Sequence, residues 1–180
     1  MFHGKYDVSE IKKHVSEYTD KEWMLETDRQ QIAIHHRKTQ FYKISYFEFE
    51  EYPDFLNYEP KLYKTANKVL ADLVMPIVKD MEKVYNGKFG RIMLTKLFAN
   101  QKITPHLDVM YDYFNIARRF HVPIITNELV DFYVDGEKKN LKEGECWEIN
   151  NNKTHAVFNK GTEDRIHLLI DILPNKVLGE

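Results

Sequence analysis

The chain has 180 residues, a formal net charge of −2 and a single cysteine. That length suits one ordinary domain, so we expect residues 1–180 to fold as a unit. Hydrophobic residues make up 43% and aromatic residues 13%, which supplies a sizeable core and excludes an intrinsically disordered chain. Basic and acidic residues are interleaved, without the one-sided basic stripe of a nucleic-acid-binding protein, so we expect no nucleic-acid partner.

The sequence also argues against a membrane protein. No apolar run is long enough to predict a transmembrane helix, and one of the longest, residues 166–173, is interrupted by His167 and Asp171. The first seven residues lack the apolar stretch of a signal peptide. Cys146, as the single cysteine, cannot form an internal disulfide. We therefore expect no membrane association and a cytoplasmic location, where the environment is reducing.

The first half of the chain has mainly helical patterns. Residues 8–18 place apolar side chains three and four positions apart, which predicts an amphipathic helix. Residues 39–49 alternate in the manner of a strand. The longest helical pattern covers residues 59–85, although Pro76 inside it should kink or divide the helix. We predict that residues 1–88 form a mainly helical support.

From Phe89 onward the pattern changes to short strands separated by turn signals such as Asp135-Gly136 and Glu143-Gly144. The predicted strands are residues 91–98, 118–126, 130–134, 146–149, 155–158 and 165–173. Many short strands at roughly 8–12-residue spacing favour a sandwich or barrel over alternating strands and helices. We therefore predict a mainly β fold with N-terminal helices, in which residues 89–173 form a cupin-like jelly-roll core.

Three residues have the composition of a metal centre. His106 and Asp108 stand two positions apart, and His155 follows His106 by 49 residues. An extended segment places side chains at i and i+2 on one face, and Pro105 favours an extended approach. Two imidazoles and one carboxylate form the facial triad that holds non-haem Fe(II) with open positions for substrate and oxygen. His-x-Asp alone is common by chance, and the chain has eight histidines, so the pattern needs a further element.

Arg165 provides that element. It stands ten positions after His155, at the start of a strongly apolar segment, where an unpaired guanidinium would be costly. A carboxylate of the protein, Asp171 or Asp164, would be the ordinary structural partner. The distal carboxylate of 2-oxoglutarate would be the functional one. Together with the triad, Arg165 favours the ligand and predicts an Fe(II)- and 2-oxoglutarate-dependent dioxygenase that uses O2.

An ordered set of short motifs then points to a family. The set comprises Thr95 and residues 105–108, 119–124, 126–127, 144–147, 155–159 and 165–171. In these residues the chain resembles the aspartyl/asparaginyl β-hydroxylase family, which also includes bacterial free-proline hydroxylases. The resemblance covers a little under half of the chain, and the N-terminal ninety residues carry no comparable signature.

The resemblance implies a double-stranded β-helix with iron bound by His106, Asp108 and His155. It implies further that Arg165 and Thr95 hold the distal carboxylate of 2-oxoglutarate. By the same comparison, Arg119 and His121 would face the carboxylate of the co-substrate or substrate. Vertebrate members that act on EGF-like domains have a glycine where this chain has Asp108, which makes the chain more similar to the small bacterial enzymes, including those acting on free amino acids.

We therefore expect hydroxylation of an unactivated C–H bond in an amino acid or in an aspartyl/asparaginyl-type residue of a peptide or protein, with release of succinate and CO2. One alternative is a non-catalytic, cupin-like module that binds a metal or small anion, although such a module would not need Arg165. Another is zinc-dependent hydrolysis, for which the sequence offers no convincing general base. His167 is expected to be a structural histidine and Cys146 a small buried hydrophobe. The choice of substrate and the oligomeric state stay open.

Overall fold

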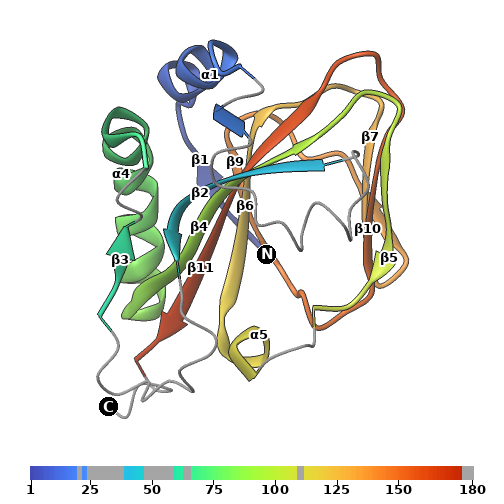
Figure 1. Cartoon of the computed structure of the whole chain (residues 1–180). Helices are drawn as coiled ribbons and strands as arrows, with labels where there is room; N and C mark the ends of the chain where they lie inside the picture. Colours follow the sequence, from blue (N-terminus) through green and yellow to red (C-terminus); the bar gives the residue numbers. More distant parts are fainter. Residues whose placement is uncertain (20–21, 24–38, 47–58, 63–65, 109–111, 176–180) are drawn as a thin grey trace.

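The computed structural model describes residues 1–19, 22–23, 39–46, 59–62, 66–108 and 112–175. These residues build two antiparallel sheets, with the helices of residues 9–16 and 68–85 on one side (Figure 1). The large sheet has the strand order β1-β9-β6-β11-β4-β2-β3 and the small sheet the order β5-β10-β7-β8. Two facing antiparallel sheets confirm the predicted mainly β, jelly-roll core with helices near the N-terminus.

The elements in chain order are β1 (Phe2–Lys5), α1 (Ser9–Ser16), β2 (Thr39–Tyr46), β3 (Lys61–Leu62), α4 (Lys68–Tyr85), β4 (Gly87–Leu97), β5 (Lys102–His106), α5 (Asp112–Ile116), β6 (Arg118–Ile125), β7 (Val130–Val134), β8 (Glu137–Lys139), β9 (Glu145–Ile149), β10 (His155–Asn159) and β11 (Arg165–Pro174). Every strand predicted in the second half is present. Four short strands, β1, β3, β5 and β8, were not predicted. Of the predicted strand 39–49, the part up to Tyr46 is confirmed and the rest lies outside the described residues.

The predicted helix over residues 59–85 is wrong in its first third. Helix α4 begins at Lys68, where the Asn67 side chain accepts a hydrogen bond from the Leu70 amide at 3.1 Å. Upstream, β3 pairs with β2 instead of extending the helix. Pro76 lies inside α4. The prediction of a mainly helical N-terminal part is therefore incomplete, since strands β1 and β2 of that part belong to the large sheet.

The large sheet buries both of its faces. One face packs against α1 and α4, and its core includes Ile166, Leu168 and Ile170 of β11 with Val74 and Val78 of α4. The period of two along a strand sends the alternate residues of β11 to the opposite face. That second face meets the small sheet through a smaller apolar cluster of Leu97, Val130, Phe132, Leu141, Ile149 and Val157. Polar side chains on this inner face are therefore enclosed between the two sheets.

Helix α4 is the longest helix of the described residues, and it runs beside β4 and β11 in Figure 1. Within the described part of the chain, no helix combines the length and the apolar character needed to cross a bilayer.

Cys146 lies in the core as predicted, fully buried on β9 with its Sγ 3.6 Å from the Met81 Sδ. Burial raises the pKa of this thiol to about 12. At about pH 8, roughly one thiol in ten thousand is then ionised. A thiol reagent can also reach the buried Cys146 only when the protein unfolds locally. We predict that a disulfide reagent labels the native protein at least about a thousandfold more slowly than the protein in denaturing guanidinium chloride.

The measurement is the release of the coloured thiolate over time, with Cys146→Ser as the blank. Equal rates in native and denaturing buffer would show that Cys146 is accessible, which contradicts its place in the core.

Candidate functional site

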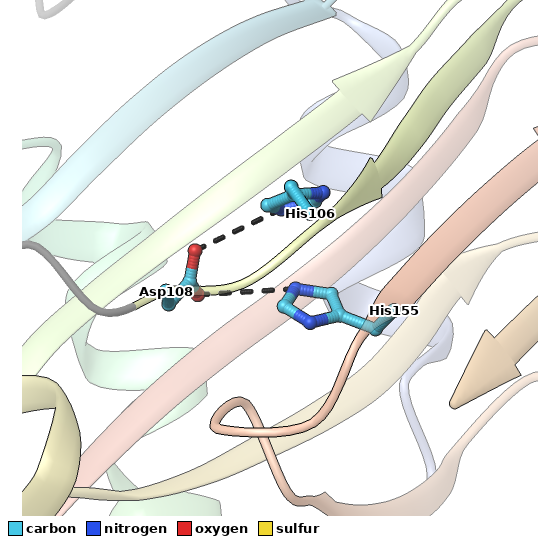
Figure 2. Close-up of side chains that lie close together, drawn as sticks. All are labelled: His106, Asp108 and His155. Carbon is cyan, nitrogen blue, oxygen red and sulfur yellow. Dashed lines mark ion pairs between the residues drawn. The ribbon is translucent and has the colours of Figure 1, made fainter. Parts of the chain in front are cut away.

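The three predicted metal ligands lie together at the edge of the small sheet (Figure 2). His106 ends β5 and stands directly opposite His155, which begins β10, so that the two rings are 4.2 Å apart between centroids. Asp108 follows two residues after β5, where its backbone N–H donates to the Asn151 carbonyl at 3.2 Å. One ligand atom from each of the three residues lies within 4.8 Å of the others.

Backbone carbonyls fix both imidazoles in the orientation that a metal needs. The His106 Nδ1 lies 2.8 Å from the Thr104 carbonyl, and the His155 Nδ1 lies 3.0 Å from the Lys153 carbonyl. A carbonyl can only accept, so each Nδ1 carries a proton, and in the neutral form of each ring the Nε2 keeps a free lone pair. The two Nε2 atoms lie 3.7 Å and 3.9 Å from the Asp108 carboxylate oxygens. Burial also lowers the pKa of His155, which keeps that ring neutral and able to bind a metal.

The family resemblance implied that Arg119 faces the carboxylate of the co-substrate or substrate, and in the structure its guanidinium contacts two carboxylates of the protein. Its Nε and Nη2 donate to the two oxygens of Asp171 at 2.7 Å and 2.9 Å. Its Nη1 contacts the Oδ2 of Asp108. Arg119 on β6 therefore joins the metal-ligand cluster to the inner face of the large sheet.

Asp171 is fully buried within this ionic cluster. Burial alone would raise the pKa of its carboxyl, but Arg119 and Arg91 hold that pKa below the usual range. The Arg91 Nε lies 3.3 Å from the Asp171 Oδ2, and the Tyr113 hydroxyl donates to the same oxygen at 3.1 Å. The sequence had suggested Asp171 as a partner of Arg165. In the structure Asp171 pairs with Arg119 and Arg91 instead.

Arg165 is 1% exposed and, among the described residues, contacts no carboxylate. Its Nη2 lies 2.6 Å from the Nδ1 of His167, and its guanidinium carbon lies 5.9 Å from the centre of the Phe132 ring. The other suggested partner, Asp164, accepts a hydrogen bond from the Ala99 amide. Burial lowers the pKa of Arg165 to about 9, a measure of how poorly its charge is compensated inside the protein.

Around Arg165 lie several buried polar atoms for which the described residues provide no hydrogen-bond partner. They are the Thr95 Oγ1, the His121 Nδ1, the Arg165 Nε and the His167 Nε2. Thr95 stands opposite His167 across β4 and β11, and His121 stands opposite Leu169 across β6 and β11. The rings of His121 and His167 are 5.8 Å apart between centroids. We name these four residues the anion pocket.

The two histidines of the anion pocket are neutral, because burial and the charge of Arg165 hold both pKa values well below the usual range. Since the His167 Nδ1 accepts from Arg165, the proton of that ring is on Nε2 and lacks an acceptor. Buried donors without partners are costly, so an arrangement of several is typical of a ligand site. The sequence had identified Thr95, His121 and Arg165, and had classed His167 as structural. The spacing of two residues does place His167 on the same face as Arg165, but spacing alone did not favour a site residue over a structural histidine.

A separate groove of about 440 Å³ lies beside His155. It is lined by Pro105, Tyr133, Gly136, Thr154, His155, Ala156, Phe158 and Lys160. Since Ala156 and Phe158 alternate with His155 and Val157 along β10, they point to the outer face of the small sheet. The groove is therefore distinct from the anion pocket, which lies between the sheets.

Comparisons with known proteins agree with this geometry. A family model described as aspartyl/asparaginyl beta-hydroxylase matches residues 7–174. A search of curated proteins finds no significant match to the chain.

Several solved structures are similar to the chain. An oxidoreductase of the 2OG-Fe(II) oxygenase family from Burkholderia pseudomallei aligns over 94% of this chain and 91% of its own, with a TM-score of 0.59 and 10% sequence identity. A predicted oxalate decarboxylase from Thermotoga maritima aligns over 51% of this chain and 72% of its own, at a TM-score of 0.39 and 18% identity. A conserved Streptococcus pyogenes protein of unknown function aligns over 47% of this chain, at a TM-score of 0.35 and 19% identity. The alignment covers 64% of the Streptococcus pyogenes chain, which is less than two thirds of that chain's length.

The Burkholderia pseudomallei structure shares the fold over almost the whole length, including the N-terminal residues in which the sequence offered no signature. The family model likewise extends to residue 7 and spans the metal-ligand triad, Arg119 and the whole anion pocket. The chain therefore belongs to the aspartyl/asparaginyl β-hydroxylase family of oxygenase enzymes.

Proposed function

We propose that the protein is an Fe(II)- and 2-oxoglutarate-dependent dioxygenase that hydroxylates an unactivated C–H bond. The observation that carries the proposal is the anion pocket, in which the described residues provide neither an anion for the buried guanidinium nor partners for the polar atoms around it. The four residues lie on the face of the large sheet that meets the small sheet, to which His106 and His155 of the metal-ligand cluster belong. Family membership implies the same pair, iron and 2-oxoglutarate.

The charge of the anion pocket fits one carboxylate. Arg165 contributes one positive charge, and the neutral His121 and His167 contribute none. A single carboxylate therefore balances the pocket, pairs with Arg165 and accepts hydrogen bonds from the Thr95 hydroxyl and the His167 Nε2. A dicarboxylate such as 2-oxoglutarate has its second, chelating end free for the metal centre.

The residues of the metal centre suit a ferrous ion, because two imidazoles held through Nδ1, with Nε2 left to bind a metal, and one carboxylate are the donor set of non-haem Fe(II) oxygenases. The chemistry that iron would supply there is the activation of O2, coupled to the conversion of 2-oxoglutarate into succinate and CO2. The protein would hold the co-substrate at its far end through Arg165, and it fixes the ligand rings through backbone carbonyls.

The substrate belongs to one of two classes, a free amino acid or an aspartyl/asparaginyl-type residue of a peptide or protein. Both present a polar group beside the target carbon. Assay of succinate release over a panel of free amino acids and short peptides distinguishes the two classes. The alternative function, a metal- or anion-binding module without catalysis, would show no succinate release with any substrate.

The proposal predicts a visible charge-transfer band when the Fe(II)-loaded protein is titrated with 2-oxoglutarate without oxygen. In Arg165→Ala the band should be lost, or need about a hundredfold more 2-oxoglutarate, because the far carboxylate has lost its charge partner. Arg118→Ala is the matched control, since Arg118 is the exposed neighbour of Arg119 and lies over the Tyr85 ring. No band in fully iron-loaded wild type would favour the non-catalytic module, and an unchanged band in Arg165→Ala would remove Arg165 from the site.

His167 should contribute to the same affinity. His167→Leu removes the Nε2 donor and the acceptor that holds Arg165, so we expect 2-oxoglutarate to bind about tenfold or more weakly. Calorimetric titration measures this change. The affinity for Fe(II) without 2-oxoglutarate should stay as in wild type, which separates the anion pocket from the metal centre. If His167→Leu binds 2-oxoglutarate with wild-type affinity, His167 has a structural role only.

Asp108→Ala should abolish turnover, because it removes the single carboxylate of the triad. Mass spectrometry of the products and an assay of succinate measure the loss. Asp72→Ala, which removes an exposed carboxylate of α4, should keep full activity. Measurable hydroxylated product from Asp108→Ala would show that the two histidines are sufficient and that the three-ligand model is wrong.

A further inference from the structure

Asp171 is the one fully buried carboxylate among the described residues. A single side chain, that of Arg119, connects it to the metal-ligand cluster. Its neighbours are Arg119, Arg91 and Tyr113 rather than the ligands themselves. Its connection to the metal centre passes through Arg119, which contacts Asp171 with two nitrogens and Asp108 with the third.

The geometry of Arg119 makes Asp171 the group that sets its direction. A guanidinium is planar, so two parallel hydrogen bonds to one carboxylate fix both its plane and its rotation. With Nε and Nη2 held at 2.7 Å and 2.9 Å, Nη1 points at Asp108. The side chains of Arg119 and Asp171 are 5% and 0% exposed, so water does not compete for these bonds.

Asp171 is itself fixed from its other side. The Tyr113 hydroxyl donates to the Oδ2 and accepts a hydrogen bond from the Arg91 amide at 3.0 Å, so both of its hydrogen-bonding roles are used. Tyr113 lies so close to Gly90 that a Cβ at position 90 would collide with the hydroxyl. Neither Tyr113 nor Asp171 can turn without disturbing β4, and the direction of Arg119 is fixed as well.

Asp108 needs such support more than the two histidines do. Both rings are held by backbone carbonyls, and His106 and His155 belong to paired strands. Asp108 lies beyond the end of β5, and Arg119 contacts one of its carboxylate oxygens, Oδ2. The contact leaves Oδ1, which is 3.7 Å from the His106 Nε2, as the oxygen available to a metal.

The charge of Asp171 acts in the same direction. Ionised Asp171 balances part of the charge of Arg119, a carboxylate that Arg119 shares with Arg91, so that Arg119 orients Asp108 with less competition against a cation for it. Without that charge, Asp108 would be the remaining anionic partner of Arg119 and would be drawn away from the metal.

We propose that Asp171 is a positioning residue of the metal centre, which directs Arg119 so that Asp108 presents one oxygen to a divalent metal. The inference rests on the proposed function in that it takes the triad to be a metal site. It adds a residue on the large sheet that touches neither the metal nor the substrate.

The test measures the affinity for Co(II), an air-stable probe for the ferrous site, together with its visible absorption spectrum. Asp171→Asn keeps the shape of the side chain and removes its charge. We expect Co(II) to bind about ten to a hundred times more weakly, with an altered spectrum because the orientation of Asp108 has changed. Asp131→Asn is the matched control, since Asp131 is also largely buried and paired, with Lys160 at 2.7 Å, but lies on the outer face of the small sheet. It should bind Co(II) as wild type does.

A second comparison separates positioning from a general loss of stability. In the Asp108→Ala background, Asp171→Asn should weaken Co(II) binding no further, because the residue on which it acts is gone. A similar loss in both backgrounds, or binding by Asp171→Asn within about threefold of wild type, would overturn the inference.

If Asp171→Asn does not fold, Arg119→Lys provides the same test, because it keeps the charge but cannot make the three contacts together. It should lower the Co(II) affinity by a similar factor, and wild-type affinity would overturn the inference. Wild-type protein that binds no Co(II) would contradict the proposed function itself. Wild-type binding without an effect at Asp171 or Arg119 would contradict the positioning role alone.

Discussion

Strand β11 is buried at all ten of its positions, and yet Arg165, His167 and Asp171 lie on it. The alternation of side chains sends Ile166, Leu168, Ile170 and Ile172 to the helices. It sends the polar residues to the space between the sheets. A buried charge without a partner costs on the order of several kcal/mol, so each of these groups constrains what lies beside it. The site follows from how the two charges on this strand are compensated.

The protein compensates them in opposite ways. Asp171 has a complete set of partners, two guanidiniums and a phenol, which makes it a rigid part of the structure. Arg165 has an imidazole and an aromatic ring but no anion among the described residues. A fold that encloses a guanidinium in this way gives up stability that an anionic ligand can restore. The same strand therefore carries the carboxylate that fixes Arg119 and, in the proposed function, the guanidinium that binds the co-substrate.

The sequence could predict the parts of the site that depend on local spacing. Period two placed His106 with Asp108, and the buried character of the last strand singled out Arg165. It could not predict that Asp171 pairs with Arg119, because this contact depends on the register that places them opposite each other across β6 and β11. The contact of His167 with Arg165 could not be predicted for a related reason. It depends on Arg165 having no carboxylate partner among the described residues, which only the structure shows.

The errors in the fold have similar causes. Strand β8 has three exposed residues, and β5 contains a proline, so neither has the apolar alternation by which a strand is recognised. The helical pattern upstream of α4 was overridden by the pairing of β3 with β2, a tertiary contact, and by the cap at Asn67. Long, regular segments were predicted well because their own pattern determines them.

The metal ligands and the anion pocket come from different sheets, so their separation depends on how the sheets pack. His106 and His155 belong to the small sheet, while Thr95, His121, Arg165 and His167 belong to the large one. Phe132 of the small sheet lies against the pocket, with its ring 5.2 Å from that of His121 and under the Arg165 guanidinium. Arg119 provides a polar connection from the large sheet to Asp108. An apolar spacer and an ionic tie thus act together to fix the distance that a co-substrate has to span, and neither sheet could define that distance alone.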